Sequence, residues 1–367
     1  MISEIRLSNF KCFDELNLPM KNVTVLTGIN GMGKSTVIQS LLALKQSYQK
    51  DEKLGKLYLN GRYVSLGNAQ DVLHEKATSD ILGVGYSTTE GDMANGWFRY
   101  IVDSDQMPVW KMENGIIVGY VPACITERLV YISAYRIGPQ DRYHVINEDE
   151  LKKREFGNDG EFALQYLGMF GDAEVKIPTM ILPDKLGNSL KNQMRLWLDR
   201  ITPGVSPQVF VNMAQRMTEV RYEFIEGKKK TNSYRSVNVG FGITYVLPVI
   251  VALLSGEAGD VIVLENPEAH IHPAGQRMLG ELIAMAGAGG VQVIVETHSD
   301  HILNGIRLSV KRDIICKEDV QIAFFYKDME DGYRHKVCTP HVMMDGRLDI
   351  WPEGFFDEWD KALYELI

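Results

Sequence analysis

A glycine-rich loop between an apolar strand and a long helix constrains this chain more than any other feature. Residues 28–36 read Gly-Ile-Asn-Gly-Met-Gly-Lys-Ser-Thr and match the pattern G-x-x-x-x-G-K-[ST]. The apolar run 23–26 supplies the strand, and the apolar-striped segment 37–48 supplies the helix, as a phosphate-binding loop requires. Glycines let successive backbone N–H groups point at phosphate oxygens, and the helix N-terminus adds a positive dipole. The loop therefore predicts a site for ATP or GTP.

The residues of this loop have separate expected roles. Lys34 would reach the β- and γ-phosphates, and the hydroxyl of Ser35 would bind Mg²⁺. The residues expected to touch the nucleotide here are Asn30, Gly31, Met32, Gly33, Lys34, Ser35 and Thr36.

The composition indicates a globular protein with one large or two smaller domains. The chain has 367 residues, of which 45% are apolar and 24% are charged, so a sizeable core is possible. Its net charge of −9 argues against a generic nucleic-acid coat, which would be basic. The four cysteines are scattered, and the longest apolar run, 245–254, is too short to span a bilayer. Because the N-terminus also lacks a signal-peptide pattern, we expect a soluble cytoplasmic protein with no membrane partner.

Three segments of different character are expected in an α/β chain. Residues 1–133 hold the P-loop and an antiparallel β subdomain, residues 134–217 form a mostly helical insertion, and residues 218–367 form a C-terminal lobe. In the first segment, short strands are expected at 81–86, 97–102, 116–121 and 128–133. Helices are expected at 161–170, 189–201, 242–254 and 273–286, and a hairpin is expected over 220–226 and 234–239.

A second apolar strand, residues 261–264, is followed directly by acidic residues. A P-loop needs a carboxylate at the end of a neighbouring strand to hold the magnesium shell. Glu265 takes that position, and Glu268 is a second candidate three residues later. An acidic residue directly after four apolar residues is unusual for a plain surface position.

Two further elements fit a nucleotide site. The strand 291–295 leads to Thr297 and His298, and a histidine there can hydrogen-bond a γ-phosphate or an attacking water. A glycine-bearing turn at 236–242 opens a helix about 20 residues before Glu265, and its N–H groups would form another anion site. His270 and His272 also invite a zinc interpretation, but no third ligand has convincing spacing.

Together these residues resemble ABC-type ATPases of the SMC/RecF/OLD branch, in the smaller single-chain AAA-like form found in bacterial genomes and phage-defence systems. The resemblance covers residues 5–39, with the entry Asn9-Phe10-Lys11, and residues 238–299. Residues 264–273 resemble the Walker B motif and D-loop of that branch, and Thr297-His298 resembles its switch histidine. Gly240-Phe241-Gly242 stands where the ABC signature belongs, and Gln70 or Asn68 stands where the Q-loop belongs.

The resemblance implies a homodimer in which two chains sandwich two ATP molecules, each P-loop facing the signature turn of the other chain. It implies ATP and Mg²⁺ as cofactors, with the metal held by Ser35, Glu265 and Gln70. The residues expected to bind nucleotide besides the P-loop are Lys11, Gln70, Asn238, Gly240 and Gly242. The residues expected to act in catalysis are Glu265, Asn266, Glu268 and His298.

Two departures from the family pattern affect the expected activity. The signature lacks the LSGGQ sequence of transporters, which argues against a transporter motor. Asn266 occupies the position next to the magnesium carboxylate where the family usually places its catalytic glutamate. An amide can orient water but cannot accept its proton. We therefore expect slow or partner-dependent turnover, with Glu268 or His298 compensating.

The leading hypothesis is an ATP-gated dimeric switch that acts with a nuclease or another effector protein, in phage defence or DNA processing, with DNA as a further partner. No Toprim-like acidic cluster follows the ATPase motifs, so cleavage would come from the partner. The alternative is an ATP-sensing scaffold with little hydrolysis of its own. A P-loop kinase or GTPase would need an acceptor pocket or an NKxD-type motif, and we find no convincing one. Lys11 and Arg136 are candidates for nucleotide or DNA contacts, or ordinary surface salt-bridge partners.

Overall fold

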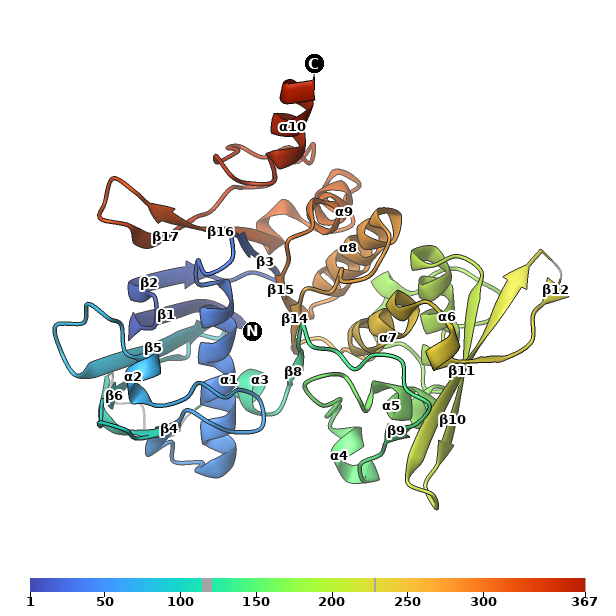
Figure 1. The fold of residues 1–367 in the computed structure, drawn as a ribbon, viewed down its shortest axis with the longest axis horizontal. Helices are drawn as coiled ribbons and strands as arrows, with labels where there is room; N and C mark the ends of the chain where they lie inside the picture. The colour runs from blue at the N-terminus through green and yellow to red at the C-terminus, as the bar shows by residue number, and fades with distance from the viewer. Residues whose placement is uncertain (114–120, 228, 367) are drawn as a thin grey trace. The chain divides into compact units, whose positions relative to one another are not determined.

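The computed structural model describes residues 1–113, 121–227 and 229–366, and the chain divides into two compact units (Figure 1). Unit 1 comprises Met1–Leu129, Val320–His341 and Leu348–Ile367. Unit 2 comprises Val130–Asp319 and Val342–Arg347. Within the described ranges, no helix combines the length and the apolar character needed to cross a membrane.

Unit 1 contains an antiparallel sheet in the order β2-β1-β5-β6-β7-β4. Its strands are β1 (Ile2–Phe10), β2 (Phe13–Pro19), β4 (Lys56–Tyr58), β5 (Ile81–Thr88), β6 (Met93–Arg99) and β7 (Gln106–Glu113). The expected antiparallel subdomain is therefore confirmed, although β6 begins four residues before the expected strand at 97 and β7 was not foreseen. The strand expected at 116–121 lies, up to residue 120, outside the described residues.

The second layer of unit 1 carries the glycine-rich loop. Strand β3 (Val23–Gly28) is buried along its whole length and pairs in parallel with β16 (Val320–Asp328), which pairs antiparallel with β17 (Arg334–Cys338). Helix α1 (Lys34–Lys50) follows the loop, and most of its residues are buried, including polar ones such as Lys45 and Gln46. The other helices of the unit are α2 (Ala69–Val72), α3 (Ala123–Thr126) and α10 (Glu358–Leu366).

Unit 2 is built around parallel strands whose side chains are apolar and buried. Strand β14 (Val261–Glu265) pairs in parallel with β15 (Gln292–Glu296), and β8 (Leu129–Ile132) lies on the other side of β14. Burial on both faces explains the continuous apolar runs of β14 and β15. The helices expected at 242–254 and 273–286 are confirmed as α7 (Phe241–Leu254) and α8 (Pro273–Ala288), and α9 (Asp300–Lys311) follows β15.

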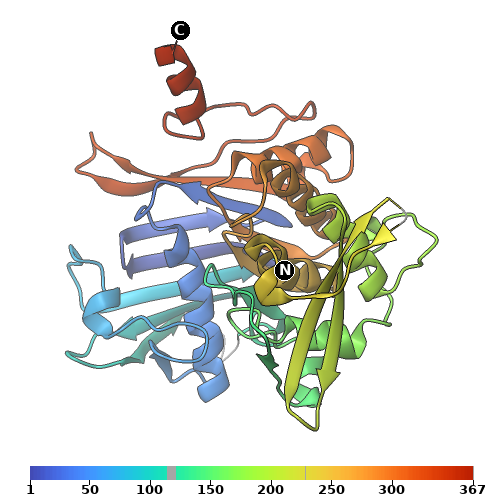
Figure 2. The same cartoon turned by 45° about the vertical axis from the view of Figure 1, so that its right-hand side comes forward.

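The rest of unit 2 combines helices with a long two-stranded ribbon. The expected helices are confirmed as α5 (Ala163–Phe170) and α6 (Leu190–Ile201), and α4 (Glu148–Lys152) precedes them. Figure 2 shows the ribbon, β10 (Val205–Asn212) and β11 (Met217–Glu226), side by side. The shorter strands on this sheet are β9 (Tyr143–His144), β12 (Lys229–Lys230) and β13 (Tyr234–Arg235).

The ribbon corrects the expected hairpin. Strand β11 pairs with β10 over eight residue pairs, whereas its pairing with β13 is limited to two. Residues Ser236–Asn238, expected to extend the hairpin strand, form a 3-10 turn instead. The missed strand, β10, contains Pro207 and lies at the sheet edge, where a residue without an N–H group is tolerated. The hairpin tip at residue 228 lies outside the described residues.

Candidate functional site

The glycine-rich loop in unit 1 curls around the amine of Lys34. The Lys34 side chain is only 3% exposed, and its Nζ donates hydrogen bonds to the carbonyl oxygens of Gly28 (2.8 Å) and Ile29 (3.1 Å). Gly31 and Gly33 adopt φ values of 78° and 104°, which glycine reaches without steric cost. The loop thus has the tight turn and the inward lysine that the motif predicts.

Close packing explains why residue 33 is glycine. A Cβ atom on Gly33 would fall 2.5 Å from the Phe13 ring and 2.7 Å from Cys12 Sγ. The loop therefore rests directly on the turn between β1 and β2, where no side chain fits. The Thr36 hydroxyl lies 3.7 Å from the same sulfur, so the start of α1 is packed against this turn as well.

His335 on β17 is a neighbour of the loop that sequence reasoning missed. Its imidazole hydrogen-bonds with the backbone of Gly31 and Cys12, and its ring meets Phe13 edge-on with centroids 6.1 Å apart. Burial and the positive charge of Lys327 lower the pKa of His335, which favours the neutral ring. No local pattern could reveal this contact, because His335 is about 300 residues from the loop in sequence.

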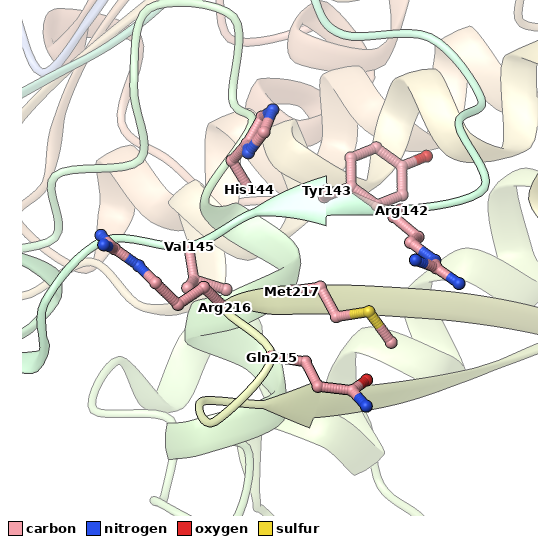
Figure 3. A pocket seen from close by; sticks show the side chains of 7 residues that line it. All are labelled: Arg142, Tyr143, His144, Val145, Gln215, Arg216 and Met217. Atoms are coloured by element: carbon pink, nitrogen blue, oxygen red, sulfur yellow. The ribbon is translucent and has the colours of Figure 1, made fainter.

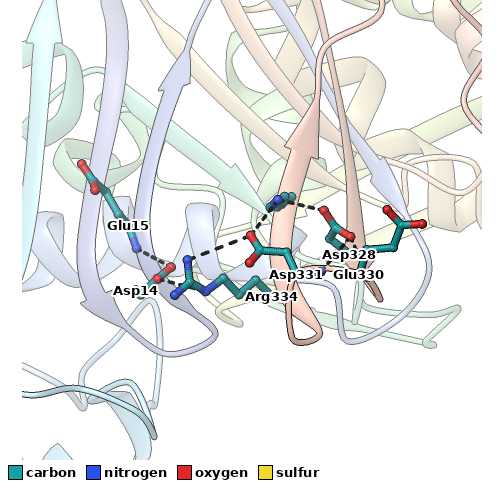
Figure 4. A network of polar contacts seen from close by, with 7 residues as sticks. Asp14, Glu15, Asp328, Glu330, Asp331 and Arg334 are labelled. Carbon is teal, nitrogen blue, oxygen red and sulfur yellow. Dashed lines mark hydrogen bonds and ion pairs between the residues drawn. The ribbon is translucent and has the colours of Figure 1, made fainter.

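The hairpin that carries His335 is held by the ion-pair network in Figure 4. Lys336 Nζ lies 2.8 Å from both Asp328 and Asp331. Arg334 lies 3.9 Å from Asp14 on β2. These exposed pairs contribute little energy singly, but together they tie both sides of the hairpin.

The other residues of unit 1 that are expected to bind nucleotide differ in burial and in hydrogen bonding. Lys11 is half-buried, its Nζ donates to Gln39 Oε1 (2.6 Å), and burial lowers its pKa. The Asn68 side chain caps α2, accepting from the N–H groups of Gln70 (2.9 Å) and Asp71 (3.3 Å). Gln70 is exposed. Because the Asn68 oxygen already caps a helix, Gln70 is the better Q-loop candidate of the two.

In unit 2, Glu265 ends β14 with one carboxylate oxygen anchored. Its Oε2 accepts hydrogen bonds from Tyr131 OH (3.0 Å) and Ala134 N (3.3 Å). Burial raises the pKa of Glu265, and these two hydrogen bonds lower it again. Sequence reasoning missed Tyr131, which meets Glu265 across 134 residues. Carboxylate and hydroxyl oxygens are ligands that Mg²⁺ prefers, so Glu265 and, in unit 1, Ser35 fit this metal by donor chemistry.

Asn266 occupies a left-handed backbone position directly after the strand. Its φ is 43°, and its N–H donates to Glu296 O at the end of β15 (2.8 Å). Asparagine tolerates this conformation better than most residues. The side-chain Oδ1 is buried, and within the described part of the chain it has no hydrogen-bond partner.

Glu268 connects this turn to the backbone of His298. Its Oε1 accepts a hydrogen bond from the backbone N–H of His298 (2.9 Å), while Oε2 is buried without a partner among the described residues. Burial raises the pKa of Glu268. His298 is exposed, and Ser299 behind it caps α9 and donates to Gln276 Oε1 (2.6 Å). The structure thus brings together the four residues expected in catalysis, at the ends of two adjacent strands.

The signature-like turn, residues 236–242, lies at the start of α7. Asn238 and Gly240 are exposed, and Gly240 is the residue preceding the helix. The first turn of α7 therefore begins at an exposed part of the surface, as an anion site would need.

Both histidines of the zinc alternative have structural roles. The His270 ring packs against Phe241 (4.8 Å between centroids) and Tyr245 (5.1 Å). His272 Nδ1 accepts a hydrogen bond from Ala274 N (3.3 Å) and so caps α8. These contacts account for both side chains without a metal.

Arg136 differs from both interpretations that its sequence position suggested. It is neither a surface salt-bridge partner nor exposed to a ligand, because only 3% of its surface is accessible. Its guanidinium donates to backbone carbonyls, including those of Glu265 and Asn266. Burial lowers its pKa to about 10, which still leaves it charged at neutral pH.

A hollow of about 420 Å³ in unit 2 lies apart from these residues (Figure 3). It is lined by Arg142, Tyr143, His144, Val145, Gln215, Arg216 and Met217. The guanidinium groups of Arg142 and Arg216 point to opposite ends of the hollow, so they do not converge on one ligand (Figure 3).

Comparison with known proteins gives three matches to family models. A model described as an AAA ATPase domain matches residues 1–87. An AAA domain model whose description names the AbiEii toxin of Type IV TA systems matches residues 141–304. A third, described as a protein of unknown function (DUF3696), matches residues 315–366.

A curated nuclease and two solved SMC head structures are among the proteins similar to this chain. The OLD nuclease of Thermus scotoductus is 21% identical over 388 residues, which cover 95% of this chain and 68% of the nuclease. The Smc head domain with an extended coiled coil from Pyrococcus furiosus, bound to the C-terminal domain of ScpA, has a TM-score of 0.50 at 12% identity, covering 100% of this chain and 99% of that one. The SMC head domain from Thermotoga maritima has a TM-score of 0.44 at 9% identity, covering 92% and 98%. The expected resemblance and the ABC-type α/β fold class are confirmed.

Proposed function

Because this chain carries AAA-type ATPase domains on the fold of an SMC head, we propose that it binds ATP with Mg²⁺ and hydrolyses it slowly as a dimeric switch. The observation that carries the proposal is the curled loop around Lys34, whose amine lies 2.8 Å from Gly28 O. An amine buried in this position favours the charge of a polyphosphate.

Glu268 is the proposed general base of the hydrolysis. Asn266 can orient the attacking water but cannot take its proton. Glu268 Oε2 is buried with no partner among the described residues, and burial raises the pKa of this carboxyl, which makes it a stronger base than an exposed glutamate. The water gives its proton to Oε2 as its oxygen attacks the γ-phosphorus, and ADP leaves. Mg²⁺, held by Ser35, Glu265 and Gln70, would neutralise charge on the phosphates.

We further propose that ATP joins two chains. The exposed Asn238 and Gly240 and the half-buried Gly242, at the start of α7, would contact the nucleotide of the partner chain, opposite Lys11 and the P-loop. A nuclease or similar protein would respond to this closure, in phage defence or DNA processing within the cytoplasm. Similarity to an OLD nuclease supports a link between this chain and nuclease chemistry.

Phosphate release by the purified chain with ATP and Mg²⁺ tests the ATPase proposal. We expect slow turnover that disappears in Lys34→Ala. Turnover that persists in Lys34→Ala would show that the activity does not use this loop and would overturn the proposal.

An ATP-sensing scaffold is the second candidate, and Asn266 favours it because an amide replaces the usual base. The scaffold predicts ATP-dependent dimers without phosphate release, and turnover that appears only in Asn266→Glu. Light scattering with ATP, run beside the phosphate assay, separates the two. A chain that stays monomeric with ATP bound would exclude both.

A further inference from the structure

Arg136 is a buried cation at the centre of unit 2. Its Nε donates to Tyr245 O (3.1 Å), and its Nη1 donates to Ser133 O (2.9 Å) and Glu265 O (2.8 Å). Its Nη2 donates to Asn266 O (2.6 Å). The guanidinium thus contacts four carbonyl oxygens from three separate segments. A planar fork of donors is suited to such a set, whereas a lysine amine could satisfy only part of it.

One of these segments is the helix that the signature-like turn begins. The guanidinium carbon of Arg136 lies 4.5 Å from the centroid of the Tyr245 ring, so this residue holds Arg136 both by its carbonyl and by its ring. The Tyr245 hydroxyl donates to Ala134 O (2.5 Å). Helix α7 is therefore fastened to the loop after β8 through Arg136 and Tyr245.

The start of α7 also touches the segment that follows Glu268. A Cβ atom on Gly242 would fall 2.1 Å from His270 O, so the two backbones are in direct contact. The His270 ring fills the space beside Phe241 and Tyr245. His270 has a φ of 64°, like the positive φ of Asn266, so this backbone depends on its surroundings to keep its conformation.

We propose that Arg136 is a positioning residue that couples the signature-like turn (residues 236–242) to the catalytic turn (residues 265–268). A shift of α7 moves Tyr245 O and the ring under the guanidinium. Arg136 passes this shift to the carbonyls of Glu265 and Asn266, because the same planar group holds all three. In the proposed dimer, engagement of the signature-like turn by the nucleotide of the partner chain therefore adjusts the catalytic residues of the chain that provides the turn. This consequence rests on the proposed function, whereas the coupling itself does not.

Arg136 acts through these turns and not on the nucleotide directly. Its side chain is 3% exposed, and its donors are directed at carbonyls. Loss of Arg136 should consequently change turnover and cooperativity more than ATP affinity.

Arg136→Met and Arg136→Lys test the coupling, with Arg154→Met as a matched control. Arg154 is another buried arginine of unit 2, ion-paired with Asp260 and donating to Ser255 O (3.1 Å) away from both turns. In Arg136→Met we expect kcat to fall roughly tenfold or more and the Hill coefficient for ATP to drop to one, with the ATP Kd nearly unchanged. Arg136→Lys should recover part of the kcat and part of the Hill coefficient. Arg154→Met should lower the Tm and leave the kinetic values in place.

Hydrogen exchange gives a readout that does not need turnover. We expect faster exchange in both 236–242 and 265–272 in Arg136→Met, and in neither segment in Arg154→Met. Exchange that changes in only one of the two segments would overturn the coupling. Equal kinetic losses in Arg136→Met and Arg154→Met would show a merely structural role and overturn it too. A wild-type chain that neither dimerises nor hydrolyses ATP would instead defeat the proposed function, and the exchange result would still decide the coupling.

Discussion

The carboxylate of Glu268 is divided between two roles, because its Oε1 accepts a hydrogen bond from the backbone N–H of His298 over 2.9 Å while its Oε2 is buried without a partner among the described residues. The first oxygen fixes the turn that presents His298. The second can receive a proton. One residue therefore connects the ends of β14 and β15, and in the proposed hydrolysis it would also supply the basic group that Asn266 lacks.

Replacing Glu268 by glutamine should separate these two roles. The new amide oxygen could still accept from His298 N, but the amide could not take a proton from water, so we expect kcat to fall by roughly 10²–10⁴-fold. ATP affinity should not change. Phosphate release measures kcat, and ATP titration measures the affinity. Glu318→Gln, at an exposed position of unit 2, is the control. Retained turnover in Glu268→Gln would exclude this residue as base and leave His298.

The same substitution should stabilise the fold at neutral pH. Burial raises the pKa of Glu268, so the folded state bears the cost of an ionised, buried carboxylate once the pH exceeds this raised pKa. The folded chain then binds more protons than the unfolded chain between the ordinary and the raised pKa, and stability falls as pH rises through this window. Glu268→Gln should melt above wild type at pH 8, and the difference should shrink toward pH 5. Thermal unfolding across this range checks the sign, and a constant difference would contradict it.

The parts of the site that sequence could predict are those that a local pattern carries. The P-loop could be predicted because its motif lies within nine consecutive residues, 28–36. Glu265, Glu268 and His298 could be predicted because they follow apolar strands, and parallel pairing brings the ends of those strands to one edge of the sheet. The contacts of Tyr131, Arg136 and His335 could not be predicted, because each depends on residues more than 100 positions away.

The fold shows the same limit. Helices α5 to α9 follow from their apolar periodicity or from the strands before them. The partner of β11 could not be inferred, because Pro207 weakens the strand pattern of β10 and pairing in the ribbon depends on tertiary packing.

Two glycines of the P-loop should respond differently to alanine. Gly33→Ala adds a Cβ that would fall 2.5 Å from the Phe13 ring at a φ of 104°, so we expect a loss of roughly 2–4 kcal/mol of stability and of ATP binding. Gly31→Ala has the same kind of backbone (φ 78°), but no described atom lies within 4 Å of the added Cβ. It should lose only about 1 kcal/mol. Urea unfolding of both variants compares them, and equal losses would show that packing on Phe13 is unimportant.

The left-handed backbone at Asn266 predicts how this position tolerates change. At a φ of 43°, alanine should cost about 1 kcal/mol of unfolding free energy relative to asparagine, whereas glycine should cost less than alanine. Asn266→Glu would meet the same backbone cost, so any turnover it gains should come with reduced stability. Urea unfolding of the three variants measures this, alongside phosphate release. A stability order with alanine above glycine would mean that the turn has relaxed out of the left-handed region. In that case, the carbonyl of residue 266 would no longer be held toward Arg136 as it is here.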